Sequence, residues 1–145
     1  MNVPEATIPL AIAKDVEGAF VVDAISTDGG VAPRNVQVRS GLALVRYGAL
    51  TLSEFVLKTS FNASRMFGMV DKGHLGVGAD ADVSVLDLQK GTAVMSLALG
   101  QVIMIDGVVT GRSGTILTTK RGETRVARSG LPYHLIDLSD GRFYA

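Results

Sequence analysis

Few residues in this chain have types and positions suited to acid–base or metal chemistry, and Asp28 is the first of them. It follows the apolar stretch of residues 19–26 and precedes Gly29 and Gly30. A carboxylate beside a divalent metal stays ionised and can act as a base. An Asp-Gly pair can equally do no more than reverse the chain. The residues alone leave both interpretations open.

The chain has only two histidines, His74 and His134, and no cysteine. A catalytic zinc site usually takes two or three histidines and keeps one open position, so two distant histidines are too few for most such sites. The absence of cysteine excludes a disulfide scaffold, a thiol nucleophile and a cysteine-rich zinc site. We predict His74, in a glycine-rich loop, to be a packed or solvated side chain and not a ligand.

Composition places the chain among globular proteins. Its 145 residues suit one ordinary domain, with 47% hydrophobic and 19% charged residues. Lys plus Arg and Asp plus Glu are both 14, so the net charge is zero and no basic field attracts nucleic acid or an acidic membrane. No signal peptide or membrane span is evident. We therefore expect a cytoplasmic protein with neither nucleic acid nor membrane as partner.

The first half of the chain alternates strand and helix signals. Residues 19–26 are β-branched and apolar on both faces, which is typical of a buried parallel strand. Residues 4–14 predict the end of a helix, or else a frayed N-terminus. A second helix is expected from Pro33 or Asn35 to Tyr47, closed by a glycine cap at Gly48.

A third helix is marked by Thr51, with Glu54 three residues later in the spacing of a capping box. It is expected to end at Gly68. Its predicted apolar face repeats at helical spacing. That face comprises Leu52, Phe55, Val56, Thr59, Ala63, Met66 and Phe67.

Beyond Val70 the pattern becomes all-β. Residues 82–87 alternate like a half-buried strand. Asp106-Gly107, between apolar runs, is the strong signal for a hairpin with a type I′ turn. The tail from Lys120 is polar and rich in turn residues, with a further turn expected at Asp140-Gly141.

Several of these motifs, in this order, resemble the amidohydrolase superfamily, which includes dihydroorotases, hydantoinases and N-acyl-amino-acid deacetylases. Residues 72–87 read KGHLGVGADADVSVLD and are similar to its KG-x-L-x-x-G-x-DAD stretch and the strand that follows. Asn62-Ala63 resembles its Asn-Pro-Ala, without the proline. Residues 102–109 resemble its closing hairpin. The resemblance extends from about residue 24 to residue 111.

The resemblance implies an α/β fold: the C-terminal fragment of a TIM-type (β/α)8 barrel, comprising its last strand and helices, joined to part of a small β-sandwich. The expected divisions are residues 1–70, 71–118 and 119–145, the last being a C-terminal extension. In the family the glycine-rich stretch is structural. Accordingly Gly76 and Gly78 should only turn the chain, and Asp80 and Asp82 should only bond backbone in turns.

The resemblance also implies chemistry for Asp28, which would end the last barrel strand as both metal ligand and catalytic base. Catalytic residues of TIM barrels project from the C-terminal ends of strands. A divalent metal, zinc in the first place, would lower the pKa of its bound water. The implied reaction is hydrolysis of a C–N bond in a small-molecule, non-peptide amide such as an N-acyl amino acid or a cyclic ureide. No substrate-binding residue is indicated.

Most of the family's metal ligands, including its His-x-His pair, have no counterpart here. We therefore expect the isolated chain to be inactive, whether it is a truncated gene product, a fragment, or a subunit completed by another. Each case predicts exposed apolar surface, covered by a second copy in a homo-oligomer or by a missing N-terminal barrel segment. The alternative is a non-catalytic structural or interaction module without a metal.

Overall fold

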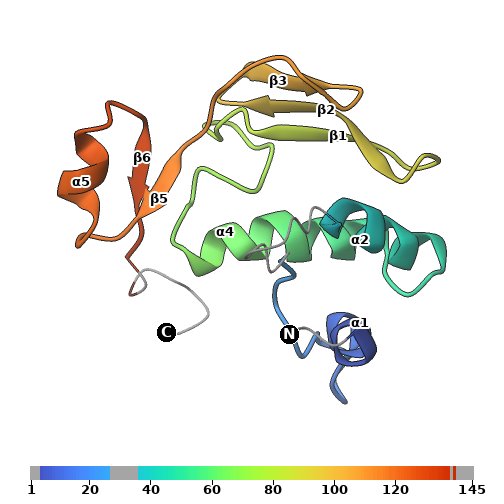
Figure 1. Ribbon diagram of the computed structural model, residues 1–145. Coiled ribbons are helices and arrows are strands. Elements are labelled where there is room, and N and C mark those ends of the chain that lie inside the picture. Colours follow the sequence, from blue (N-terminus) through green and yellow to red (C-terminus); the bar gives the residue numbers. More distant parts are fainter. Residues whose placement is uncertain (1–3, 27–35, 138, 140–145) are drawn as a thin grey trace. The chain divides into compact units, whose positions relative to one another are not determined.

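The computed structural model describes residues 4–26, 36–137 and 139. The chain divides into two compact units: unit 1 comprises Met1–Ala63 and Asp87–Thr92, and unit 2 comprises Ser64–Leu86 and Ala93–Ala145. Helices and antiparallel sheet are both present (Figure 1), which agrees with an α/β chain at the level of mixed helix and sheet. The barrel, the sandwich and the three-part division stay predictions. In the described ranges no helix is long and apolar enough to cross a membrane.

The helices of unit 1 follow the local signals closely. They are α1 (Pro4–Ile12), α2 (Gln37–Arg46), α3 (Leu52–Val56), the π-helical turn η1 (Leu57–Phe61) and the start of α4 (Asn62–Met66). The predicted capping box is confirmed, because Thr51 Oγ1 accepts the Glu54 N–H at 3.1 Å and Glu54 Oε2 accepts the Thr51 N–H at 2.7 Å. Gly48, at φ +71°, follows α2 as its expected cap.

The apolar face predicted for the third helix is only partly right. Phe55 is 3% exposed, but Leu52 and Val56 are 39% and 44% exposed. Phe55 of α3 packs against Gly41 of α2, and the lack of a side chain at Gly41 leaves room for the Phe55 ring. Three residues after Phe55, Lys58 is also buried, and the buried face therefore runs through a lysine.

The strand predicted over residues 19–26 is wrong as secondary structure. Phe20 forms an isolated antiparallel bridge with Lys14, and residues 22–26 have no regular structure. A parallel strand takes its hydrogen bonds from a neighbouring strand, and no strand pairs with this segment among the described residues of unit 1. Side chains of helices hydrogen-bond it instead.

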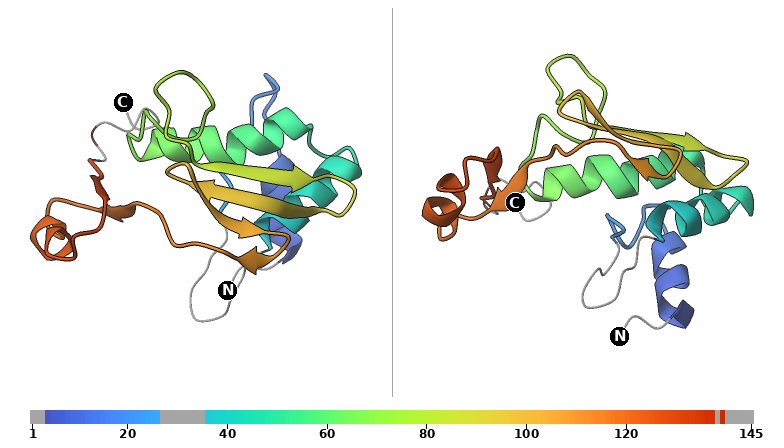
Figure 2. Two further views of the ribbon diagram at one scale, coloured as in Figure 1. Left: turned by 90° about the horizontal axis from the view of Figure 1, so that it is seen from above. Right: turned by 45° about the horizontal axis from the view of Figure 1, so that its top comes forward.

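Unit 2 contains a sheet in the order β1-β2-β3-β4, formed by β1 (Val83–Asp87), β2 (Thr92–Ala98), β3 (Gln101–Ile105) and β4 (Val108–Val109). Figure 2 shows β1, β2 and β3 side by side from above. β3 pairs antiparallel with both β2 and β4. The turn of Asp106 and Gly107 has φ +46° and +82°, as the predicted type I′ hairpin requires. Strand β2 was not predicted.

The C-terminal part of unit 2 is more ordered than its polar sequence suggests. Strands β5 (Ile116–Thr118) and β6 (Tyr133–Leu135) pair in parallel, with α5 (Glu123–Ala127) between them in the chain. Its helix and strand pair were not predicted from the polar pattern. The turn expected at Asp140-Gly141 lies outside the described residues.

The close approach of Gly41 to Phe55 can be tested with Gly41→Ala. A Cβ at this position would overlap the Phe55 ring, so the variant should be less stable by about 1–3 kcal/mol despite the higher helix propensity of alanine. Urea denaturation measures the difference. Ser40→Ala, on the exposed side of α2, is the matched control and should stay within about 0.5 kcal/mol of the parent. A stabilised Gly41→Ala would contradict the packing described.

Candidate functional site

The segment of residues 22–25 is held by polar side chains of three helical elements in unit 1. Lys58 Nζ, from η1, donates a hydrogen bond to the Val22 carbonyl. Asn62 Nδ2, at the start of α4, donates to the Asp23 carbonyl at 2.7 Å, and Gln37 Nε2, in α2, donates to the Ile25 carbonyl at 2.7 Å. Three backbone acceptors of one short segment are thus bound without a neighbouring strand.

The π-helical turn supplies a fourth bond to the same segment. In an α-helix the Asn62 N–H would bond the Lys58 carbonyl, four residues earlier. Here it bonds the Leu57 carbonyl, five residues earlier, and the Lys58 carbonyl accepts the Ile25 N–H at 3.0 Å. Lys58 therefore contacts the segment through both its side chain and its backbone. Single π-turns of this kind occur frequently at functional sites.

Aromatic and acidic groups surround the buried amino group of Lys58, whose residue is only 1% exposed. Its Nζ lies 3.9 Å from the centroid of the Phe20 ring, and Lys14 Nζ lies 4.6 Å from the same centroid. Burial lowers the pKa of Lys58, and the nearby carboxylates of Asp23 and Glu54 oppose that shift in part. Burying the amino group costs free energy, and its hydrogen bond to the Val22 carbonyl offsets part of that cost.

Glu54 connects this region to the start of the helix. Its carboxylate accepts a hydrogen bond from Lys14 at 2.7 Å and others from Thr51. The bond from Lys14, followed by those from Thr51, lowers the pKa of Glu54 to about 2. Glu54 is consequently ionised at neutral pH.

Asp28, the predicted catalytic residue, lies outside the described residues, two positions beyond Ser26. Its role as base and metal ligand stays a prediction. Sequence reasoning did not single out Lys58 or Gln37 and treated Asn62 only as part of a motif. The available signal was a lysine three residues after Phe55 and four before Asn62, on the side of the helix that Phe55 buries.

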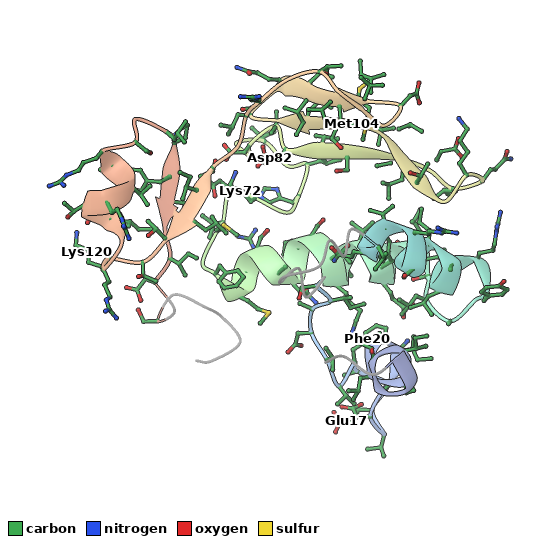
Figure 3. The ribbon with its side chains drawn as sticks, viewed as in Figure 1. Glu17, Phe20, Lys72, Asp82, Met104 and Lys120 are labelled. Carbon is green, nitrogen blue, oxygen red and sulfur yellow. The ribbon has the colours of Figure 1, made fainter. Side chains whose placement is uncertain are left out.

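The glycine-rich stretch of unit 2 is organised by Lys72, whose Nζ lies 2.6 Å from Asp80 Oδ2 and 2.6 Å from Asp82 Oδ2. Figure 3 shows Lys72 and Asp82 next to each other. Asp82 Oδ1 also accepts the Leu99 N–H at 2.7 Å. Leu99 has φ +50°, a conformation costly for a leucine, in the turn between β2 and β3. Asp82 bonds backbone as expected, but both aspartates also bind the side chain of Lys72, so the expectation that they bond backbone alone is wrong.

His74 is occupied by its own loop. Its Nε2 lies 2.9 Å from the Val70 carbonyl oxygen, and its Nδ1 accepts the Gly76 N–H at 3.0 Å. Both ring nitrogens are thus within hydrogen-bonding distance of backbone groups of the same loop. A Cβ at Gly76 would come within 2.9 Å of His74 Nδ1, so glycine permits this contact. His134 lies in β6, in the parallel pair with β5.

The described residues do not by themselves fit a metal ion. Within residues 4–26, 36–137 and 139, no group of three or more His, Asp or Glu side chains is arranged to hold one. Asp28 is outside those ranges and would add a single carboxylate. A catalytic metal would therefore need ligands that this part of the chain does not supply.

Comparison with known proteins gives a family and a fold. Residues 1–119 match the family described as the Amidohydrolase family. Among solved structures, the chain is similar to the formyltransferase/hydrolase complex of Methylorubrum extorquens, determined in complex with methylofuran, with a TM-score of 0.54 and 20% sequence identity. The match covers 90% of this chain and 30% of that chain, and at this identity it bears on fold alone. No curated protein matches.

The contacts of Asp82 predict a specific pH dependence of stability. Burial raises the pKa of Asp82, but the hydrogen bonds from Lys72 and the Leu99 N–H outweigh it and hold the pKa below its ordinary value. A lowered pKa means that the carboxylate stabilises the fold above the unfolded-state pKa and that this contribution is lost as pH falls through the folded-state pKa. Asp82→Asn should cost about 1 kcal/mol at pH 7, and less as pH falls below about 4.

Urea denaturation of the parent and of Asp82→Asn at neutral and acidic pH measures this difference. Asp106→Asn removes one carboxylate from an exposed turn of the same unit and is the charge-matched control. A stability difference for Asp82→Asn that is equal at both pH values would show that its ionised form has no special role.

Proposed function

The chain belongs to the amidohydrolase family, and from this premise we propose that it is the C-terminal part of a metal-dependent hydrolase acting on C–N bonds of non-peptide amides. The observation that carries the proposal is the family match over residues 1–119, which includes both the helix-bound segment and Asp28. This chain matches only 30% of the length of the similar solved chain, which supports the proposal of a longer complete enzyme. Its fold would contain a TIM-type barrel and a small β-sandwich.

In this proposal Asp28 is the catalytic residue that the chain contributes. It follows a segment whose backbone is bound at Val22, Asp23 and Ile25. Asp28 would bind the divalent metal, zinc in the first place, and accept a proton from the attacking water. The remaining ligands would come from a region that the described residues do not include. The substrate class is an N-acyl amino acid or a cyclic ureide.

Asp28→Asn tests the proposal in an assembly of this chain with a polypeptide that supplies the other metal ligands, in the presence of zinc. The substitution removes the proton acceptor and keeps the shape, so turnover should fall by about 10²-fold or more. Release of the amine from an N-acyl amino acid measures it. Asp106→Asn is the charge-matched control and should keep parental turnover. Undiminished activity of Asp28→Asn would remove Asp28 from the mechanism.

A second candidate is a non-catalytic structural or interaction module. The absence of a three-ligand group from the described ranges favours it. Zinc analysis of the purified chain can exclude this second candidate, because tight, stoichiometric zinc binding by the 145 residues alone would refute a module without a metal. Turnover in the zinc-containing assembly that Asp28→Asn abolishes would also refute the module.

We further propose that the chain associates, with a second copy or with an N-terminal barrel segment. Along one helix of unit 1, Leu52, Val56 and Leu57 are 39%, 44% and 47% exposed. Apolar surface of this kind favours association. Sedimentation of the purified chain should show a dimer or larger species, and Leu57→Glu should shift it toward the monomer. A monodisperse, highly soluble parental monomer would contradict this proposal.

A further inference from the structure

We propose that the part of unit 2 formed by β5, α5 and β6 is a docking surface for an extended, acidic segment of a partner protein. This part, residues 112–136, is called the basic module below. The juxtaposition that carries the proposal is a group of exposed arginines beside a parallel strand pair with an open edge. Binding at this surface would require neither Asp28 nor a metal ion.

The zero net charge of the chain is unevenly distributed. The basic module contains five basic residues and one acidic residue, which gives it a net charge of +4 and leaves −4 for the rest of the chain. All five basic residues are exposed: Arg112, Lys120, Arg121, Arg125 and Arg128. A strongly positive surface within a neutral chain favours an anionic partner.

Three of these arginines have no acidic partner. Glu123 pairs with Lys120, and among the described residues no ion pair engages Arg121, Arg125 or Arg128. Arg125 lies four residues after Arg121 and three before Arg128, spacings at which like charges on a helix repel. A cation is favourable at the C-cap, where Arg128 lies, but unfavourable before the N-cap, where Arg121 lies. An anionic partner would relieve this repulsion.

The strand pair beside these arginines has an open edge. β5 and β6 form a sheet of only two strands, and α5 contacts both of them (Figure 1). The Pro132 carbonyl and the Ile136 N–H of the β6 segment bond β5. Successive strand residues direct their backbone groups to opposite sides, so Tyr133 and Leu135 direct theirs away from β5. Sheets usually contain more than two strands, and a third strand could add at this edge.

Several features favour a protein segment over nucleic acid or a membrane. An open strand edge offers main-chain donors and acceptors, which an extended peptide matches by adding a strand. Arginine outnumbers lysine four to one in the basic module, and protein interfaces are enriched in arginine and depleted in lysine. Exposed apolar side chains accompany the arginines: Leu117, Leu131, Tyr133 and Leu135.

Charge also decides against the same surface of a second copy. Two basic modules brought face to face would repel each other, because each carries a net charge of +4. An acidic segment would instead place carboxylates beside the arginines, and the guanidinium group binds carboxylates with two parallel hydrogen bonds. The partner is therefore assigned as an acidic segment of another protein.

The experiment measures binding of two fluorescent peptides to the full 145-residue chain by anisotropy. One peptide repeats Glu-Thr-Thr and can add as a strand. The other repeats Glu-Pro-Pro, has the same charge and lacks the N–H groups that a strand needs on either side. Single-stranded oligothymidylate and vesicles containing phosphatidylserine represent other anionic partners. Amide hydrogen exchange with and without the first peptide reports on Tyr133 and Leu135.

Variants of the chain test the arginines. Arg125→Gln with Arg128→Gln removes two positive charges from the basic module, and Arg125→Lys with Arg128→Lys keeps them. The matched control is Arg39→Gln with Lys90→Gln, which removes two exposed cations from unit 1. Circular dichroism checks that each variant is folded. If the glutamine variant does not fold, the comparison of the two peptides on the parent chain decides without it.

We expect the Glu-Thr-Thr peptide to bind about tenfold more tightly than the Glu-Pro-Pro peptide and to slow exchange of the Tyr133 and Leu135 amides. Its affinity should fall about tenfold in the glutamine variant and at about 0.5 M salt. The lysine variant and the control should bind as the parent does.

Three results would overturn the proposal. The first is no binding of the Glu-Thr-Thr peptide, equal binding of the two peptides, or unchanged exchange at Tyr133 and Leu135. The second is tighter binding of the oligonucleotide or of the vesicles, which would assign the surface to another class of partner. The third is salt-dependent self-association that the glutamine variant abolishes, which would assign the surface to a second copy.

Discussion

A buried amino group must have an acceptor, and in this protein the amino group of Lys58 has the Val22 carbonyl. The bond satisfies two groups at once, because a buried amino group at 1% residue exposure and a backbone carbonyl without a partner strand are each costly when unpaired. The same helix forms two further hydrogen bonds with this segment: the Asn62 side chain donates to the Asp23 carbonyl, and the Lys58 carbonyl accepts the Ile25 N–H. Removal of the amino group would leave the Val22 carbonyl without this donor.

The two units use lysine in opposite ways. Lys58 faces a backbone carbonyl and an aromatic ring, and burial lowers its pKa. Lys72 lies between the carboxylates of Asp80 and Asp82, which overcome the effect of burial and raise its pKa. The charge of Lys72 is thereby secured, and it holds Asp82 where the carboxylate also binds the strained turn at Leu99. One lysine organises a chain segment, whereas the other organises a glycine-rich loop and, through Asp82, a hairpin.

Local signals were sufficient wherever the physics is local. The Thr51 capping box and the Asp106-Gly107 turn depend on residues within three positions of one another, and both were predicted correctly. The strand over residues 19–26 was wrong because an apolar pattern does not reveal whether a neighbouring strand exists. Leu99 at positive φ was unpredictable for a similar reason, since it is stabilised from 17 residues away by Asp82. In the candidate site, Lys58 depends on contacts 36 residues distant, which no short window contains.

The π-turn has a tertiary origin, and the sequence around Asn62 supports this. Helix distortions usually arise from proline, from glycine pairs, or from an insertion into the hydrogen-bond ladder. The family's Asn-Pro-Ala would place a proline where this chain has Ala63, so no proline distorts the helix here. What coincides with the distortion is the Ile25 N–H, which bonds the carbonyl that Asn62 would use in a regular α-helix. The helix is therefore irregular at Lys58, the residue that bonds the segment of residues 22–25. The absence of the proline after Asn62 does not remove the hydrogen bond from Asn62 to the Asp23 carbonyl.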